Sequence, residues 1–321
     1  MFRKRRIVFN LMTYVPGVSA IPAVQRKLQS RVTGTGGTSS ARYCYSIWLR
    51  HLVLAAASGL NTEGIAIAEL GPGDSLGIGL SALLSGAERY LALDVVAHAS
   101  AERNLAIFEE LVGLFRARVP IPDDAEFPAA NPKLDSYDFP DHVLTVGRLE
   151  DALHPERLDL IRASLSNCTS SDSLIQYRAP WLADAVMERS SVDMILSQAV
   201  LEHVDQLQEV YRAMRLWLAP GGFMSHQIDL KSHGWAQQWS GHWAYSDLAW
   251  KLIRGKDVWM INREPASTHI REIAAQGFRL VRELRVSAPM STPRQDLAPR
   301  FRSMSDQDLV TSGLFVQAVR S

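Results

Sequence analysis

A short apolar run followed by a glycine-rich turn constrains the fold of this chain more than any other feature. Residues 65–70 (IAIAEL) are apolar, and residues 71–77 (GPGDSLG) supply glycines for a sharp turn into a helix that runs through Ser85. A second apolar run, residues 90–94 (YLALD), follows this helix. Strand, turn, helix and strand in this order form a βαβ unit, which places its two strands side by side in a parallel sheet.

The same alternation of apolar runs and helical segments continues to the end of the chain. Five further runs predict strands, at residues 173–177, 192–197, 223–228, 278–286 and 314–319. Helical spacing predicts helices at residues 99–118, 149–166, 207–218 and 270–276. We therefore expect an α/β fold with a doubly wound, mostly parallel seven-stranded sheet.

Three segments stand outside this alternation. Residues 1–60 contain a helical pattern and predict an N-terminal helical cap, which leaves 61–321 as the main domain. Residues 119–145 are rich in proline and aspartate and predict an insertion over the sheet edge. Residues 231–262 carry five of the chain's eight tryptophans and predict a lid. These aromatic rings either stack on a sugar or form the core of the lid.

Charge and composition exclude several classes of protein. Lys+Arg and Asp+Glu number 34 each, and this neutral balance disfavours a nucleic-acid partner. The two cysteines, Cys44 and Cys168, lie too far apart for a zinc knuckle or a disulfide framework. No apolar run reaches the roughly 18 residues of a membrane helix, so no stable membrane insertion is expected despite the basic start at 1–6. We expect a cytoplasmic protein, for which a homodimer is possible.

The glycine turn itself excludes two nucleotide-binding motifs. A dinucleotide fingerprint needs glycines at 71, 73 and 76, but position 76 is leucine and the third glycine arrives at 77. A phosphate-binding P-loop is excluded because no Gly-Lys-Ser/Thr follows. A turn of this spacing, with an acid just before the first glycine, suits a different nucleotide.

Four segments, taken in order, resemble the class I S-adenosylmethionine-dependent methyltransferases of the small-molecule type. They are ELGPG at 69–73, the acid Asp94 at the end of the second strand, VDMILSQAVLEHV at 192–204 and LAPGGF at 218–223. The resemblance covers roughly residues 60–230. It implies S-adenosyl-L-methionine as the cofactor.

The resemblance also implies a role for individual residues of the cofactor site. Gly71 and Gly73 would lie under the methionine part, and Glu69 would help to hold its amino group. Asp94 would accept hydrogen bonds from the ribose hydroxyls, since a carboxylate has two acceptor oxygens and no donor. The remaining positions are expected near the adenine, at Pro180 and Trp181, and after the fourth strand, at Ser197 and Gln198. Asp94 as a helix N-cap, and the two glycines as plain turn residues, are the alternatives.

Candidate acceptor-site groups follow the fourth and fifth strands, where an open α/β sheet binds ligands. We expect His226, Asp229 and His233 to face the acceptor, with His203 as an alternative base, because an alcohol must lose a proton when it is methylated. Hydrogen-bonded structural histidines are the alternative reading. Two imidazoles and a carboxylate are also a plausible metal set, but their spacing matches no metal motif and no metal is expected.

The expected reaction is methyl transfer to a small-molecule or carbohydrate-like acceptor, on oxygen. The segment SQAV at 197–200 lacks the Asn/Asp-Pro-Pro-Tyr/Phe pattern of enzymes that methylate amino nitrogens of DNA or glutamine. Two alternatives come from other classes: an NAD-dependent oxidoreductase, and a catalytically inactive methyltransferase-like binding protein.

Overall fold

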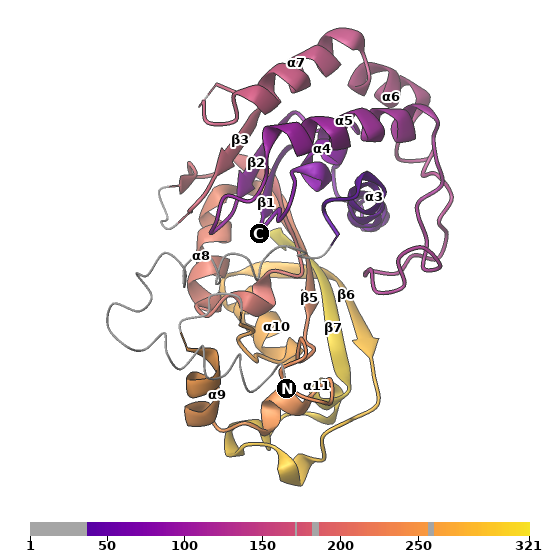
Figure 1. The fold of residues 1–321 in the computed structure, drawn as a ribbon. Helices are drawn as coiled ribbons and strands as arrows, with labels where there is room; N and C mark the ends of the chain where they lie inside the picture. Colours follow the sequence, from indigo (N-terminus) through magenta and orange to yellow (C-terminus); the bar gives the residue numbers. More distant parts are fainter. Residues whose placement is uncertain (1–36, 171, 182–185, 256–259) are drawn as a thin grey trace.

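A single sheet forms the centre of the molecule (Figure 1). The computed structural model describes residues 37–321, apart from 171, 182–185 and 256–259. The strands are β1 (Ala66–Leu70), β2 (Arg89–Leu93), β3 (Ile175–Arg178), β4 (Val192–Gln198), β5 (Leu218–Asp229), β6 (Phe278–Ser287) and β7 (Thr311–Arg320). Their order is β3-β2-β1-β4-β5-β7-β6, with β7 antiparallel to both of its neighbours and the other pairs parallel. The predicted seven-stranded, mostly parallel sheet is confirmed.

Helices cover both faces of the sheet, as a doubly wound fold requires. They are α3 (Ala41–Ala57), α4 (Gly77–Leu83), α5 (Ala101–Arg116), α6 (Val146–Ala152), α7 (Pro155–Ser166), α8 (Leu207–Trp217), α9 (Asp247–Arg254), α10 (Ala266–Ala275) and α11 (Asp306–Leu309). One apolar core joins α3, α4, α5 and α7 to the sheet, and a second core joins α8 and α10 to its other face. Neighbouring residues of β1, such as Ile67 and Ala68, point into opposite cores. Strands buried on both faces therefore appear in the sequence as continuous apolar runs.

Two of the differences from the predicted boundaries have a clear physical cause. The helix predicted at 149–166 is two helices, because Pro155 has no backbone N–H and begins a new helix, α7. The strand predicted at 223–228 begins earlier, at Leu218. Leu218 pairs with Val192, the register then shifts, and Phe223 pairs with Met194. The sequence APGG at 219–222 thus lies inside the strand, where the shift absorbs its extra residues.

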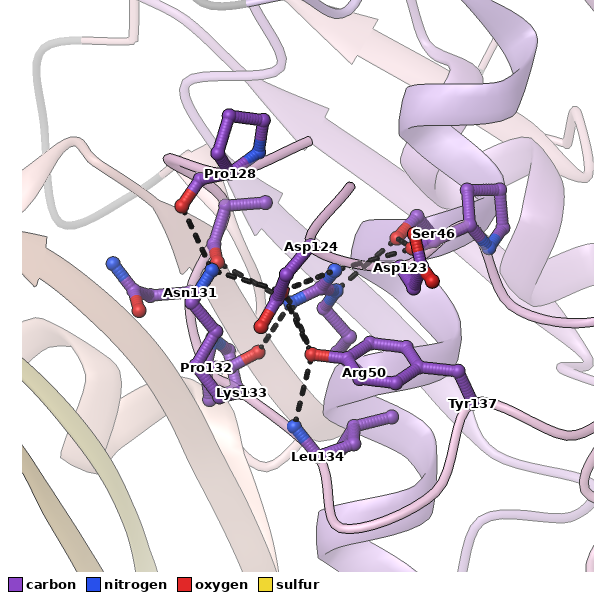
Figure 2. A network of polar contacts seen from close by, with 12 residues as sticks. Ser46, Arg50, Asp123, Asp124, Pro128, Asn131, Pro132, Lys133, Leu134 and Tyr137 are labelled. Carbon is purple, nitrogen blue, oxygen red and sulfur yellow. Dashed lines mark hydrogen bonds and ion pairs between the residues drawn. The ribbon is translucent and has the colours of Figure 1, made fainter. Parts of the chain in front are cut away.

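Side chains of α3 hold the insertion at 119–145, and Arg50 makes the most contacts among them. Arg50 is fully buried and donates hydrogen bonds to the carbonyl oxygens of Pro122, Ala130 and Pro132, at 3.1, 3.2 and 2.8 Å (Figure 2). Its guanidinium also lies 3.3 Å from Oδ1 of Asp124. The buried guanidinium therefore ties together several carbonyls of an insertion that has no helix or strand up to residue 145. The predicted cap at 1–60 is described only from residue 37 onward, as α3 and its flanking turns.

The segment predicted as a lid, 231–262, packs against a second segment, the connection after β6. Its role as a lid stays a prediction. Because β7 is antiparallel, Asp229 at the end of β5 and Val286 near the end of β6 both pair with Gly313 at the start of β7. The connections after β5 and β6 therefore leave the sheet at the same end of its strands. Trp243 from the first connection packs with Leu297 and Phe301 from the second. The buried tryptophans 235, 243 and 250 form lid cores, whereas Trp259 lies outside the described residues.

Within the described part of the chain, no helix combines the length and the apolar character that a membrane crossing requires.

Candidate functional site

The glycine turn after β1 has a backbone that only glycine adopts without strain. Gly71 has φ +66° and Gly73 has φ +74°, both in the left-handed region. A Cβ atom on Gly71 would lie 2.6 Å from Cγ2 of Val200, in the segment that follows β4. The turn therefore packs directly against the connection that carries the predicted acceptor residue His203.

Asp94 follows β2 and binds the glycine turn. Its Oδ2 accepts a hydrogen bond from the Gly73 amide at 3.3 Å, and its Oδ1 accepts one from the Val95 amide at 2.7 Å. Burial raises the pKa of Asp94, although the amides of Val96, Val95 and Gly73 counteract this effect. Oδ2 keeps a free lone pair toward the turn, so the carboxyl can still accept a ligand hydroxyl. This donor and acceptor pattern fits a nucleoside at the edge of β1 and β2.

Glu69 lies beneath the turn rather than on its surface. Its carboxyl is 1% exposed and accepts a 2.6 Å hydrogen bond from the Tyr90 hydroxyl. Burial raises the pKa of Glu69 to about 8. The ring of Tyr90 packs against Gly79 so closely that any Cβ there would collide with it. Glu69 supports the turn from below, and its predicted contact with the cofactor amino group stays a prediction.

Pro180 and Trp181 follow β3, next to Asp94. The Ala179–Pro180 peptide is cis, and the Trp181 amide donates a 2.9 Å hydrogen bond to the carbonyl oxygen of Asp94. The Trp181 ring lies edge-to-face with Trp217 of α8, with 5.7 Å between ring centroids. The structure thus brings Trp181 beside the predicted ribose-binding carboxylate.

Ser197 and Gln198 end β4, and both side chains are engaged by the protein. Ser197 Oγ lies 2.8 Å from Nδ1 of His226. The Gln198 amide donates to the carbonyl oxygen of Asn131 at 3.0 Å, so its Oε1 faces Nε2 of His51 at 3.2 Å. Oε1 can only accept, so the His51 proton lies on Nε2 and Nδ1 accepts from the Ser225 hydroxyl at 2.7 Å. Gln198 therefore connects the site to α3 and to the insertion.

The predicted acceptor residues separate into two places. Nε2 of His233 lies 3.4 Å from Oδ2 of Asp229, and the side chains are 27% and 28% exposed. The rings of His203 and His233 lie edge-to-face with 5.3 Å between centroids. Burial alone would raise the pKa of Asp229, but the hydrogen bond from His233 and the charge of Lys231 outweigh it, so the pKa falls below its usual value.

His226 lies apart from this group. It is fully buried in β5, and burial lowers its pKa to about 3. Met224 and Ile228, two residues away on either side, belong to the core beneath α8 and α10, so His226 faces that core as well. A side chain enclosed in this way does not reach a ligand at the edge of the sheet.

Several further side chains are engaged at this edge of the sheet. His51 and Asn131 hold Gln198, and no local pattern links them to β4 because they come from α3 and the insertion. Glu202 is 2% exposed, and burial raises its pKa well above the usual value. Asn262 binds the turn that contains Glu202. Among the residues described, no three or more His, Cys, Asp or Glu side chains are arranged to hold a metal ion.

Comparison with known proteins gives one family match. Residues 153–225 match the family model described as a methyltransferase domain, which spans the segments from α7 to β5. No curated protein matches the chain.

The chain is also similar in fold to solved methyltransferase structures. An S-adenosylmethionine-dependent methyltransferase from Mesorhizobium loti is 17% identical, with a TM-score of 0.43, over 84% of this chain and 96% of the other. A geranyl diphosphate C-methyltransferase from Streptomyces coelicolor A3(2) is 11% identical, with a TM-score of 0.43, over 85% of this chain and 79% of the other. Similarities this distant add nothing about the acceptor.

Proposed function

We propose that this chain, a class I S-adenosylmethionine-dependent methyltransferase, methylates an oxygen atom of a small-molecule or carbohydrate-like acceptor. When bound, the cofactor would supply a methyl group on a sulfonium. The acceptor oxygen would form a bond to the methyl carbon as the carbon–sulfur bond breaks, with the neutral thioether as the leaving group. The protein's part in such a reaction is to align the two reactants, to exclude water and to remove the acceptor proton.

The cofactor would lie at the edge formed by β1, β2 and β3. Gly71 and Gly73 have no side chains that would block a ligand from the backbone of the turn. The Asp94 carboxyl would accept a hydrogen bond from the ribose in addition to the one from the Gly73 amide. Trp181 and Pro180 lie beside Asp94, where the adenine is expected. Ser197 and Gln198 line the same edge through their backbone, while Glu69 supports the turn from beneath.

The pair formed by Asp229 and His233 carries the proposal for the chemical step. The two side chains lie 3.4 Å apart and remain partly exposed at the edge of the sheet. Asp229 positions the ring of His233, which is the proposed acceptor of the proton from an acceptor hydroxyl. His203 lies against His233 and is the alternative base. We do not assign His226 this role, because its ring is enclosed in the core.

The proposed acceptor class follows from charge and composition. A neutral overall charge favours a small molecule over a nucleic acid, and the two scattered cysteines favour a cytoplasmic setting. The buried tryptophans of the lid form lid cores, so the lid offers fewer rings for sugar stacking than its sequence predicted.

The test combines binding with transfer of a labelled methyl group to compounds in cell extracts. We expect the wild-type protein to bind S-adenosylmethionine and not NAD in calorimetry. His233→Ala should bind the cofactor like the wild type but transfer methyl about 100-fold more slowly. The matched variant His226→Gln should keep the transfer rate at a temperature where it remains folded.

Other outcomes decide against the proposal. A full transfer rate in His233→Ala, in Asp229→Asn and in His203→Ala would remove all three residues from the chemistry. Binding of NAD in place of S-adenosylmethionine would indicate an oxidoreductase. Cofactor binding without transfer in any extract would indicate an inactive binding protein.

A further inference from the structure

We infer that Asn262 is a positioning residue of the proposed site, which holds the Leu201–Val204 turn and thereby places His203 against His233. This inference rests on the proposed function, since it gives a role to the turn that carries the alternative base.

One residue engages three carbonyl groups of the turn. The Asn262 side-chain amide donates to the carbonyl oxygens of Leu201 and Val204, at 2.8 and 2.7 Å. Its backbone N–H donates to the carbonyl oxygen of Glu202 at 2.6 Å. The three-residue 3-10 turn closes on itself with a 3.3 Å bond from the Val204 N–H to the Leu201 carbonyl. Asn262 adds donors from outside the turn to this carbonyl and to those of Glu202 and Val204.

The orientation of the Asn262 amide is fixed by its contacts. Both of its N–H groups are used by the turn, and its Oδ1 accepts a 2.8 Å hydrogen bond from the Glu264 amide. A rotated amide would place Oδ1 against two carbonyl oxygens and leave the Glu264 amide without an acceptor. The contact is therefore specific for asparagine, and aspartate of the same size cannot replace it.

The same residue ties the turn to the lid. Met260 and Ile261, immediately before it, are buried in a lid core with Trp235 and Trp250. Arg263, immediately after it, lies 4.9 Å over the Trp250 ring and donates a 2.6 Å hydrogen bond to Asp247. Asn262 thus stands between a well-packed lid and the turn of His203, so the position of His203 depends on the lid being in place.

The test follows the contact between the two histidine rings directly. In protein with isotope-labelled histidines, we expect a magnetisation-transfer peak between the rings of His203 and His233, whose centroids lie 5.3 Å apart. Asn262→Ala and Asn262→Asp should lose this peak. His51 and His269 are fully buried elsewhere, and their unchanged resonances would show that the variants are folded.

The matched control is Asn61→Ala. Asn61 also donates from its side-chain amide to a backbone carbonyl, that of Glu63 at 3.1 Å, but on an exposed loop away from the turn. This variant should keep the peak between His203 and His233. A peak of full intensity in both Asn262 variants would overturn the inference.

A second measurement needs no variant. In the wild type, the Asn262 amide and the amides of His203 and Val204, which close the turn, should exchange with deuterium at matching rates. Different exchange rates for the Asn262 amide and the amides of His203 and Val204 would contradict the inference that Asn262 and the turn open together. This result would count even if the variants do not fold. Neither readout requires an acceptor or turnover, so a failure here is distinct from a failure of methyl transfer.

Discussion

Single residues at this edge of the sheet act through backbone groups as much as through side chains. Asp94 accepts from the Gly73 amide, and Asn262 holds the carbonyls of a turn. Such contacts fix the shape of the site before any ligand binds, which lowers the ordering entropy that binding must overcome.

The first prediction concerns Asp94. Replacing Asp94 by alanine removes the acceptor for the ribose and also frees the Gly73 amide, so cofactor affinity should fall by about 1–3 kcal/mol, roughly 5- to 150-fold. Calorimetry with S-adenosylmethionine measures this change. Asp159→Ala, an exposed carboxylate on α7, serves as the control and should bind normally. Unchanged affinity in Asp94→Ala would remove the ribose assignment.

The second prediction concerns Gly71. Alanine at this position would combine a positive φ with a Cβ only 2.6 Å from Val200, so the turn must shift and cofactor binding should weaken. Adding Val200→Ala removes the obstructing methyl groups and should restore part of the affinity, while the backbone strain of about 1 kcal/mol persists. Equal affinities in the single and double variants would show that this contact does not set the shape of the turn.

At the scale of elements, the insertion at 119–145 shows how one helix can order a long irregular segment. Arg50 of α3 donates to its carbonyl groups (Figure 2). The Asn131 carbonyl within it accepts a hydrogen bond from the Gln198 side-chain amide at the end of β4. The insertion thereby becomes part of the frame around the proposed site. A segment without its own helices or strands requires such an anchor, because its backbone groups have few partners of their own.

The third prediction tests this anchor. Arg50→Met keeps the aliphatic stem but removes every donor, which leaves the carbonyls of Ala130 and Pro132 without this partner and the Pro122 carbonyl with the Ser46 hydroxyl alone. We expect a loss of about 2–4 kcal/mol in unfolding free energy and faster proteolysis within 119–145. The control, Arg42→Ala, breaks an exposed pair between the same helix and the same insertion, at Glu126. It should change stability by about 1 kcal/mol or less, and equal effects of the two variants would refute the anchor.

At the scale of the whole molecule, buried histidines and a buried glutamate make the free energy of unfolding depend on pH in opposite directions. Burial lowers the pKa of His51 to about 4 and that of His269 to about 3, below the ordinary 6.5. These residues are neutral in the folded chain but gain a proton in the unfolded chain below about pH 6.5. They therefore stabilise the fold above that pH. This contribution to stability is lost as the pH falls toward the pKa values of the two histidines in the folded chain.

Glu69 acts with the opposite sign. Burial raises its pKa from 4.5 to about 8, so between these values the folded chain keeps a proton that the unfolded chain releases. The unfolded state binds fewer protons in this window, and Glu69 lowers stability progressively as the pH rises through it.

The fourth prediction separates the effect of Glu69 on the pH dependence of stability from that of the buried histidines. Glu69→Gln removes the carboxyl, so the unfolding free energy of the variant minus that of the wild type should rise with pH by about 1.4 kcal/mol per unit in this window. Urea unfolding at about pH 5 and about pH 7.5 measures the difference. Glu110→Gln, an exposed glutamate on α5, should show no such slope. Parallel curves for Glu69→Gln and the wild type would mean that Glu69 is ionised in the folded protein.

The sequence alone determined the features that depend on neighbours along the chain. Apolar runs, glycine turns and helical spacing predicted all seven strands and their class of sheet, because a strand buried on both faces must be apolar throughout. The same local signals located the glycine turn and the acid after β2, whose backbone contact the structure shows. The cofactor contacts that follow from them remain predictions.

Only the tertiary structure decided which polar side chains share a place. His226 and His233 look alike in the sequence, yet α10 and α8 cover the face of β5 that holds His226, while His233 remains at the edge with Asp229. The second segment that packs against 231–262 and the partners of Gln198 were equally hidden, since they come from distant parts of the chain. Burial and contact depend on how the faces of separate elements pack together, and no short stretch of sequence contains that information.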